Sequence, residues 1–564
     1  MPKLIIPALI LLLAATPLAY SRTINVRPDG TGDYPTIQAA IDASVNGDEI
    51  ICADGTYTGA GNRDIDFLGK AITVRSKSGP ENCIIDCNGT EDDPHRGFYF
   101  HNGENSNSRL DGITITNGYS PTGGAILCLD SSPTITKCMF KGNLAHYIGP
   151  PPEAESKGGA IYAQDSNLLI LDCVFTANWA ERGGAFSCNT ASPTIVNCTF
   201  KDNSGVRWGG AIYSRHGNPT ITNCTIVRNS ARDSGGAIAA HGSELTITNC
   251  IVASNSTAAN AGGFYIVHSS AIVSNCTVSG NQTRLGGGIY CFGGTSTIAN
   301  CTIVGNKAEK AAGGIRCRYY ADVTTTNCII WDNSPDQIFA PPDCNLLVTY
   351  SNPQSGWSGE GNIDADPCFV EPGYWDVNGV WVEGDYRLLP TSPCIDAGDP
   401  NYNPEPNETD LDGHPRVSGH AVDMGAHEFW PPIEAYMKLT TRILNCAGRA
   451  KFVKAHITLP EKIFAEDIDV NTPAVAEPPG VESEYIKIVG GDTGPVKLEI
   501  AFDRQAFCET LTEPGQVEIT ITGFLTTGQY FYATDAIRIK PKRRQIIPKL
   551  LKSELNKPHR GKSL

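Results

Sequence analysis

The sequence predicts an all-β protein, a right-handed parallel β-helix (a solenoid) followed by a small C-terminal β-sandwich. The main observation is a repeat built on "NCT" or its variants. Eight such cysteines, from Cys138 to Cys328, follow one another at intervals of 25 to 35 residues, and an asparagine follows each by five residues. A fixed period of this length indicates stacked units, each too small to bury a face alone. The composition agrees, because 58 glycines, 37 prolines and only 18% charged residues are typical of a turn-rich β chain.

One repeat reads as one coil of the solenoid. In "PTITNCTIV", Cys224 and Ile226 keep the period of two that a strand requires, whereas Ile221 to Cys224 is a step of three. The chain should therefore bend near Asn223. A Gly-Gly pair precedes the next alternating segment, "GGAIYSR". Three short strands and three turns complete a coil, and coils should stack at about 4.8 Å, the strand spacing.

Stacking turns repeated residues into ladders. The cysteines should form an inward column of free thiols, with a disulfide ladder as the alternative. A second column should hold Cys128, Cys188, Cys291 and Cys317. Zinc is a poor explanation because the chain has no Cys-x-x-Cys pairs. Asparagines at the corners should bond one another and the backbone along the stack.

The two ends of the chain differ from the acidic body. Residues 1–21 read as a signal peptide, with Lys3, an apolar run and a small-residue cleavage site at "AYS". We therefore expect a secreted or cell-surface protein with no transmembrane segment in the mature chain. Residues 542–564 read as a basic, flexible tail. The net charge of −16 argues against a nucleic-acid partner.

Between these ends we expect three parts. Residues 22–338 should form the β-helix, capped at its start by a helix in "TIQAAIDASV" whose apolar stripe is Ile37, Ala40, Ile41 and Val45. Residues 339–429 should hold closing coils and an Asp-rich module. Residues 430–541 alternate like the strands of an Ig-like β-sandwich, which Cys446 and Cys508 could bridge.

Three parts of the chain carry a resemblance to known families. "DGTGDYPTIQAAIDA" with "GDEIICADGTY" resembles the start of the pectin-lyase-like superfamily, pectinesterases included. The "GGAI" and "F/IxxN" repeats are similar to those of polymorphic outer-membrane proteins, and together the likenesses cover about residues 25 to 335. They imply the fold rather than an activity. "SPCIDAGDPNYNPEPNETDLDGHPRVSGHAVDMGAHEF" resembles a closing module of secreted bacterial β-helix proteins.

The closing module gathers acidic side chains. Asp410, Asp412 and Asp423 could hold Ca²⁺, which prefers oxygen ligands. The alternative, which we favour, is turn chemistry, in which Asp bonds its own backbone. We expect no other cofactor.

The resemblance suggests a search for catalytic groups. Pectinesterase-type catalysis needs paired aspartates with an arginine, and no pair in neighbouring coils matches. Polygalacturonase-type hydrolysis needs a Gly-His-Gly turn, which is absent. Lyase-type elimination needs acidic calcium ligands and a basic residue, a pattern too loose to decide.

The strand after each Gly-Gly pair offers two outward columns. One residue past the apolar position, successive coils carry Leu127, Tyr162, Ser187, Tyr213, Ala239, Ile266, Tyr290 and Arg316. Three residues past it, they carry Leu129, Gln164, Asn189, Arg215, His241, His268, Phe292 and Arg318. Tyrosine beside arginine or histidine can stack on sugar rings and pair with carboxylates. The candidate groove residues are Tyr162, Arg207, Trp208, Tyr213, Arg215, His241, His268, Tyr290, Phe292 and Arg318. A polar face without function is the competing interpretation.

The sequence therefore predicts a non-catalytic scaffold that binds extracellular polysaccharide or cell-envelope material. One alternative is a pectin-lyase-like enzyme, a lyase or hydrolase acting on acidic polysaccharide. A second is a purely structural surface protein.

Overall fold

The computed structural model describes residues 21–540 except 148–154, 441, 447–449, 462, 492–493 and 527–528. The predicted signal peptide (apart from Ser21) and the predicted basic tail lie outside the described residues. The chain divides into two compact units, residues 1–429 and 430–564. Within the described part, no helix is long and apolar enough to cross a membrane.

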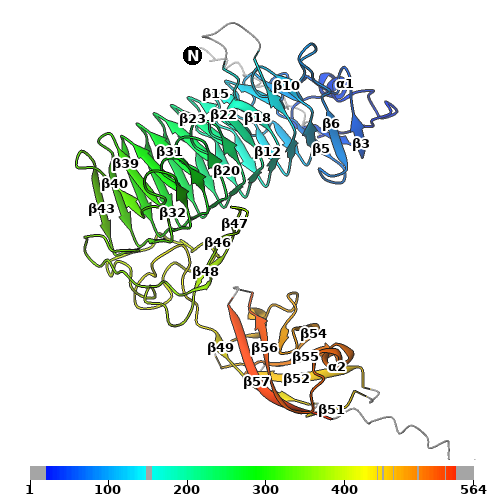
Figure 1. The fold of residues 1–564 in the computed structure, drawn as a ribbon. Coiled ribbons are helices and arrows are strands. Elements are labelled where there is room, and N and C mark those ends of the chain that lie inside the picture. Colours follow the sequence, from blue (N-terminus) through cyan, green and yellow to red (C-terminus); the bar gives the residue numbers. More distant parts are fainter. Residues whose placement is uncertain are drawn as a thin grey trace, which may run out of the picture. The chain divides into compact units, whose positions relative to one another are not determined.

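The first unit is a parallel β-helix built from four sheets (Figure 1). Sheet A has 13 strands from β1 (Thr23–Val26) to β43 (Asn345–Thr349), and sheet B has 12 from β3 (Gly55–Tyr57) to β44 (Asn352–Pro353). Sheet C has 11 strands from β4 (Ile65–Asp66) to β42 (Ile338–Phe339), and sheet D has 8 from β10 (Tyr119–Ser120) to β38 (Lys307–Ala308). The prediction of a parallel β-helix is confirmed. The parallel ladders continue to residue 353, inside the region expected to hold closing coils.

A typical coil runs through the sheets in the order C, A, B, D. Its strands are β19 (Phe186–Asn189), β20 (Thr194–Val196), β21 (Thr199–Lys201) and β22 (Ser204–Trp208). Every strand pairs in parallel with its counterpart one coil away, as Ile195 of β20 does with Ile221 of β24 (Thr220–Thr222). The chain thus needs one strand more per coil than the sequence predicted, since the short strands of sheet D were not foreseen.

The corner between sheets A and B has the predicted bend. Asn223 takes a left-handed φ of 54°, and Asn197, Asn249 and Asn275 repeat it in neighbouring coils. Asparagine tolerates this conformation better than most residues with a side chain. The step of three between Ile221 and Cys224 is therefore a backbone turn.

Two polar ladders run through the core beside the apolar residues. From Cys138 to Cys250, each backbone N–H donates to the Sγ of the cysteine in the next coil at 3.4 Å. The corner asparagines, from Asn143 to Asn306, each donate Nδ2 to the Oδ1 of the next asparagine at 2.9 to 3.1 Å. The repeated cysteines are free and buried. Each coil is thus hydrogen-bonded to the next through its core as well as through its strands.

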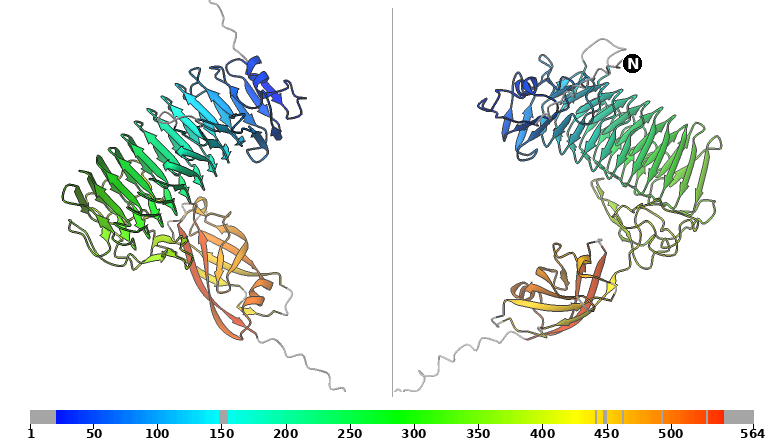
Figure 2. Two further views of the ribbon diagram at one scale, coloured as in Figure 1. Left: turned by 45° about the horizontal axis from the view of Figure 1, so that its top comes forward. Right: turned by 180° about the vertical axis from the view of Figure 1, so that it is seen from behind.

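Helix α1 (Ile37–Ala43) covers the first coil, at the N-terminal end of the stack in Figure 2. Thr36 caps it by accepting from the Ala39 amide, and Ile37, Ala40 and Ile41 are buried. The prediction that Val45 belongs to the buried apolar stripe is wrong, because Val45 follows the helix and is 53% exposed. The helix ends at Ala43 because Ser44 is already extended, with ψ of 160°.

A closing module of residues 354–429 follows the last coil. It contains two antiparallel pairs, β45 (Phe369–Glu371) with β48 (Asp385–Leu388), and β46 (Tyr374–Trp375) with β47 (Trp381–Val382). Its buried side chains pack with Val304 and Ile329 of sheet B in a small separate core. The module therefore lies along the outer face of sheet B, as β46, β47 and β48 show in Figure 1.

The second unit is the small C-terminal β-domain. Its strands form one mixed sheet, with both parallel and antiparallel neighbours. The two layers expected of a β-sandwich are hydrogen-bonded into this single sheet. The order is β49 (Ile433–Glu434), β57 (Tyr530–Ile539), β56 (Gly515–Phe524), β53 (Val475–Glu477), β54 (Val481–Gly490), β55 (Lys497–Asp503), β52 (Phe452–Thr458) and β50 (Tyr436–Leu439), with β51 (Ile443–Leu444) beside β57. The sheet is nearly closed, because the Leu439 amide on β50 donates to the Asp535 carboxylate on β57 at 2.8 Å.

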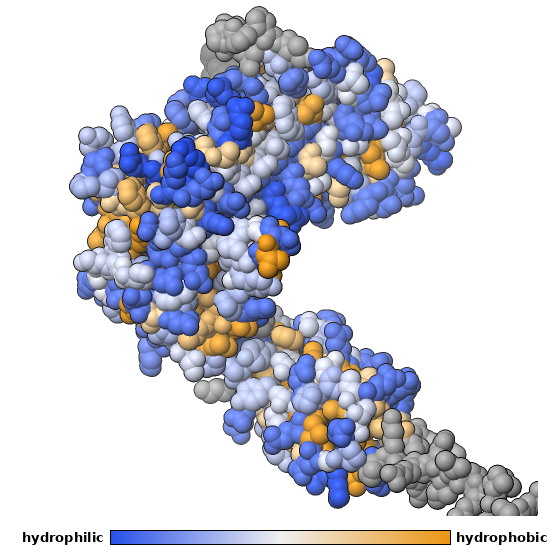
Figure 3. Space-filling model, in the orientation of Figure 1, coloured by the Kyte–Doolittle hydropathy of each residue, from blue (hydrophilic) through white to orange (hydrophobic). Residues whose placement is uncertain are grey.

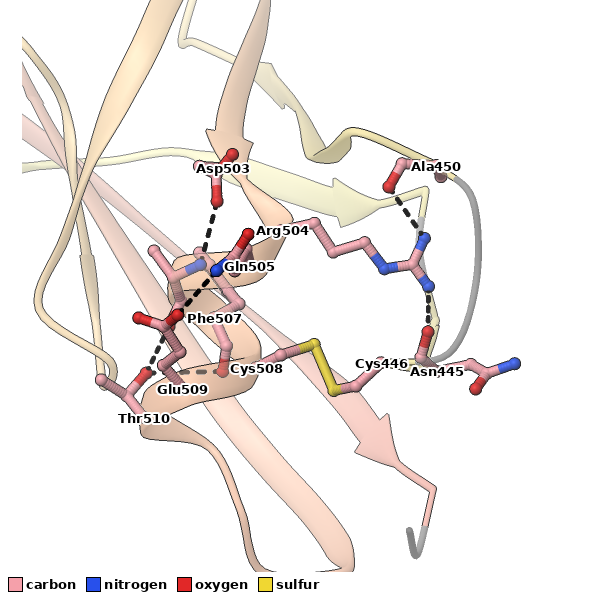
Figure 4. Close-up of a disulfide and its surroundings, with 11 residues drawn as sticks. Asn445, Cys446, Ala450, Asp503, Arg504, Gln505, Phe507, Cys508, Glu509 and Thr510 are labelled. Carbon is pink, nitrogen blue, oxygen red and sulfur yellow. Dashed lines mark hydrogen bonds between the residues drawn. A yellow bond between two sulfur atoms is a disulfide. The ribbon is translucent and has the colours of Figure 1, made fainter. Parts of the chain in front are cut away.

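One disulfide fastens helix α2 (Arg504–Thr510) to this sheet. It joins Cys446 to Cys508, the pair named from the sequence (Figure 4). The Arg504 guanidinium donates to the backbone carbonyl of Ala450 at 3.3 Å. It also donates to the backbone carbonyl of Asn445, the residue before Cys446. The covalent bond and these hydrogen bonds hold the same short segment.

Candidate functional site

The first outward column of sheet C keeps the predicted tyrosines in register. Its members are Leu127, Tyr162, Ser187, Tyr213, Ala239, Tyr265, Tyr290 and Arg316. The prediction of Ile266 is wrong, because Tyr265 holds that position and Ile266 is buried in the core. The reason lies in the preceding turn. Ala261 adopts the left-handed conformation, with φ of 54°, that Gly235 adopts at the equivalent position one coil earlier. The Gly-Gly pair therefore lies one residue later relative to the start of the strand.

This column is covered, which contradicts its expected exposure. Tyr162, Tyr213 and Tyr290 are 5%, 1% and 5% exposed. Cations lie over their rings: Lys157 is 5.6 Å from the Tyr162 centroid, and Arg182 is 5.4 Å from that of Tyr213. Lys157 precedes the turn that enters sheet C, and Arg182 is the last residue of β18 (Trp179–Arg182) in sheet D. These three tyrosines therefore lie beneath the surface residues and support them.

The second column reaches the surface. It contains Arg215, His241, Val267, Phe292 and Arg318, and both arginines are exposed. His268, which was expected in this column, lies one residue further on, in the corner between sheets C and A, with φ of 45°. The displacement has the same origin as that of Ile266.

Aromatic rings link these residues into one strip across the coils. The aromatic strip comprises Trp208, His241, His268, Phe292, Tyr319 and Tyr320. Trp208 stacks on His241 at 5.9 Å and 5°, and Phe292 stacks on Tyr319 at 5.1 Å and 3°. His268 joins the two pairs through edge contacts at 6.4 Å with His241 and 5.7 Å with Phe292. Tyr319 and Tyr320 are 53% and 72% exposed, so the strip ends in open aromatic surface.

A hollow of about 320 Å³ lies at the other end of the strip. Trp208, Tyr213, His241 and Tyr265 line it, with Asp233 and Asn260 at its edge. Burial, and then the nearby Arg215, lower the pKa of His241. The imidazole is therefore mainly uncharged at neutral pH and can act as a flat, polar ring.

Positive charge borders the strip. Among the residues described, no carboxylate pairs with Arg215 or Arg318. Arg207 differs, because its Nη1 lies 3.2 Å from Glu155, which also pairs with the buried Arg182. Arg182 in turn lies 4.5 Å from the centre of the Trp208 ring. Arg182 and Glu155 therefore position Trp208, while Arg215 and Arg318 remain available to an anion.

Sequence reasoning left out Tyr319 and Tyr320, and it placed Arg316 in the first outward column without predicting its burial. Tyr319 and Tyr320 directly follow Arg318 and would have appeared if the count had continued past the strand. Arg316 is only 8% exposed, and its Nε and Nη1 lack a hydrogen-bond partner in the described structure. It lies 4.6 Å from the Tyr290 ring. Its burial depends on packing between coils, which the local pattern does not reveal.

The predicted calcium residues do not meet at one point. Both oxygens of Asp423 accept backbone amides, from Asp396 and Phe429, and Asp410 accepts those of Asp412, His414 and Glu428. The favoured interpretation, turn chemistry, describes the local contacts of Asp410 with Asp412 and His414, whereas the Asp396–Asp423 and Glu428–Asp410 contacts join distant parts of the module. In the described part of the chain, Asp410, Asp412 and His414 form a group within 4.8 Å that leaves out Asp423. No cation site follows from this cluster.

On the face shown in Figure 3, hydrophilic residues predominate and apolar residues form small separate patches. Neither unit presents a large continuous apolar area on that face. Recognition by the first unit is therefore better sought in its polar and aromatic residues than in apolar docking.

Comparisons with known proteins bear on the fold. No curated protein matches the chain. Among solved structures, pectate lyase Pel9A is similar, with 16% identity over 72% of this chain and 96% of that one and a TM-score of 0.36. The PL6 family alginate lyase AlyGC is 15% identical over 64% of this chain and 55% of that one, with a TM-score of 0.37. The A-module of the Azotobacter vinelandii mannuronan C-5 epimerase AlgE4 is 12% identical over 58% of this chain and 95% of that one, with a TM-score of 0.23.

A family match is more extensive. The sequence matches the family described as "Right handed beta helix region" in three overlapping stretches, residues 49–226, 124–308 and 209–356. Together these stretches span residues 49–356, which is more than half of the chain. The protein therefore belongs to the right-handed beta helix family.

Proposed function

We propose that the protein binds an acidic polysaccharide, without catalysis, along the aromatic strip of sheet C. The observation that carries the proposal is the strip itself, a run of contacting rings bordered by two exposed arginines without carboxylate partners. Arg215 and Arg318 lie four coils apart, which is about 19 Å at the strand spacing. The strip is thus long enough to meet several sugar units of one chain.

The chemistry of the strip suits a uronate polymer. Aromatic faces stack on the C–H surface of sugar rings, and Tyr319 and Tyr320 offer such faces to solvent. Guanidinium groups bind carboxylates through two parallel hydrogen bonds. The chain as a whole is acidic, with a net charge of −16, so this strip is the place where an anionic chain would be attracted.

The expected location of the protein supports the same ligand class. A signal peptide at residues 1–21 would carry the chain out of the cytoplasm. Polysaccharide and cell-envelope material are found outside the cytoplasm. We propose that the protein acts there, secreted or held at the cell surface.

Isothermal titration of the full mature chain with hexagalacturonate and with alginate hexamers tests the proposal. We expect at least one of them to bind, and binding to weaken about tenfold or more in the double variant Arg215→Ala/Arg318→Ala. Arg109→Ala, an exposed arginine on sheet A, is the matched control and should bind like the wild type. Absence of binding by both hexamers would overturn the proposal.

A product assay separates binding from catalysis. The same polymers are incubated with the protein, with and without Ca²⁺, and examined for unsaturated or reducing ends. We expect none. Their appearance would favour the alternative, a lyase or hydrolase of acidic polysaccharide.

A further inference from the structure

A second cleft, of about 410 Å³, lies between sheet B and the closing module. Its floor is formed by outward residues of β25 (Thr225–Val227), β29 (Ile251–Ala253) and β33 (Thr277–Ser279). Its walls are formed by residues 383–387 and by Asp412 and His427 of the closing module. All of these belong to the first unit, and none belongs to the aromatic strip.

One buried hydroxyl in the floor lacks a partner. Thr277 is 3% exposed, and its Oγ1 makes no hydrogen bond with any described residue. Thr302 holds the same position one coil further on, and its Oγ1 accepts the Ala426 amide of the closing module at 3.0 Å. The closing module thus satisfies one threonine of this column and leaves the other facing the cleft. Buried polar groups are normally paired, so Thr277 indicates a ligand that supplies a hydroxyl or carbonyl.

The walls present fixed pairs of donors and acceptors. His427 Nδ1 lies 2.9 Å from the Asp412 carboxylate, and Arg387 Nε donates to Asp385 at 2.9 Å. The Glu383 carboxylate accepts from Ser279 Oγ at 2.7 Å and from Trp381 Nε1 at 3.1 Å. Side chains held in this way keep their remaining lone pairs and N–H groups in defined directions, which suits the closely spaced hydroxyls of a sugar.

The cleft also has apolar surface and room to extend. Ile251, which is 36% exposed, lies in its floor beside Tyr386. A second hollow of about 560 Å³ shares Ile251 and Glu383 with it and contains Trp375. The two hollows are therefore neighbours, so a ligand of more than one ring could extend from one toward the other.

The charged side chains of the cleft indicate which class of sugar it would bind. The cleft contains three carboxylates, Glu383, Asp385 and Asp412, against one guanidinium and one imidazole. An anionic uronate would meet repulsion here, in contrast to the arginine-bordered strip. We propose that this cleft is a second glycan-binding site, specific for a neutral oligosaccharide. The inference is independent of the proposed function of the strip.

The experiment titrates the full mature chain with cellohexaose, xylohexaose, mannohexaose and maltohexaose, with hexagalacturonate as the anionic probe. At least one neutral hexaose should bind. Thr277→Val, which removes the hydroxyl and keeps the shape, should weaken that binding about tenfold, as should Asp412→Asn. Thr248→Val, a half-exposed position on sheet A, is the matched control and should leave it unchanged.

Two measurements keep the outcome separate from that of the strip. The variant Arg215→Ala/Arg318→Ala should bind the neutral hexaose like the wild type. Thr277→Val should unfold at the same temperature as the wild type or higher, since it removes a buried unpaired group. The proposal is overturned if no neutral hexaose binds at millimolar concentration, if Thr277→Val and Asp412→Asn leave the affinity unchanged, or if hexagalacturonate competes for the same site.

Discussion

Asn229 donates its side-chain amide to the Oδ1 of Asn255, 3.0 Å away in the next coil. The same oxygen also accepts the Asn229 backbone amide at 2.8 Å, and both asparagines are fully buried. The replacement Asn255→Ala removes this acceptor from the core, and with it the Asn255 side-chain amide that donates to Ile226 and Asn281. We expect the free energy of unfolding to fall by about 3 kcal/mol, because each buried group left unpaired costs about 1–3 kcal/mol. Urea unfolding followed by circular dichroism measures it.

The matched control for this replacement is Asn218→Ala. Asn218 is an exposed asparagine in the corner between sheets C and A of a neighbouring coil. Its loss should change stability by less than about 0.5 kcal/mol. Equal effects of the two replacements would contradict a stabilising role for the ladder.

The free cysteines should differ sharply in reactivity. Of the 18 free cysteines, only Cys344 and Cys368 are partly exposed. Burial raises the pKa of Cys188 to about 11, which further lowers its thiolate fraction. Titration with a chromogenic disulfide reagent should count two thiols in the native protein and 18 in denaturant. A count in denaturant well below 18 for unreduced protein, restored to 18 by a reductant, would instead favour the disulfide ladder.

The Cys446–Cys508 disulfide should stabilise the second unit alone. It closes a loop of 62 residues, for which the chain-entropy model gives about 4 kcal/mol. The double variant Cys446→Ser/Cys508→Ser should therefore lower the unfolding temperature of the second unit. Calorimetry of the full chain checks this, and the transition of the first unit, which contains no disulfide in its described residues, is the internal reference.

Stability of the first unit should fall as the pH rises through neutrality. Burial raises the pKa of Glu428 to about 8 and that of Asp423 to about 6, although Arg416, 3.3 Å from Glu428, opposes the shift. Unfolded carboxyls titrate near pH 4, so the native state holds more protons between about pH 4 and 8. The stabilisation from these protons is full below about pH 4 and is lost as the pH passes about 6 and then about 8.

Thermal unfolding between about pH 5 and 9 measures this dependence. Glu428→Gln mimics the protonated acid, so its unfolding temperature should change less than that of the wild type between about pH 7 and 9. Glu405→Gln, at an exposed position of the same module, should follow the wild type. Parallel curves for wild type and Glu428→Gln would show that Glu428 does not hold the proton.

The open end of the aromatic strip can be tested without disturbing the fold. Tyr319 is 53% exposed and stacks on Phe292, so Tyr319→Ala should weaken uronate binding by about 1–2 kcal/mol with little loss of stability. Tyr436→Ala, at a 71% exposed position of the second unit, is the control. The two variants should unfold at similar temperatures and differ only in affinity.

The repeat could be predicted from the sequence because it is local. Cys224, Asn229 and the bend at Asn223 each recur at a fixed spacing, and stacking converts that spacing into contacts. The exposure of Tyr213 could not be predicted, since Arg182 and Trp208, the last residues of neighbouring strands in sheet D, cover its ring, and the local sequence pattern does not show such contacts.

The second cleft was beyond sequence reasoning for a different reason. It brings Ser279 within hydrogen-bond distance of Glu383, 104 residues later in the chain. No periodicity connects those positions, because the closing module does not repeat. Contacts of this kind appear only once the module has packed against sheet B.

The turn between sheets D and C is where coils differ in length. The 35-residue interval from Cys138 to Cys173 has its extra residues between β14 (Leu144–Ala145) and β15 (Ile161–Gln164), and β22 also carries a one-residue irregularity there. In both cases the strands on either side keep their pairing. Insertions in this turn are therefore tolerated by the architecture, and Glu155, which follows the longer one, pairs with Arg207 next to Trp208 of the aromatic strip. Divergence of such a stack can reshape its recognition face while its interior stays the same.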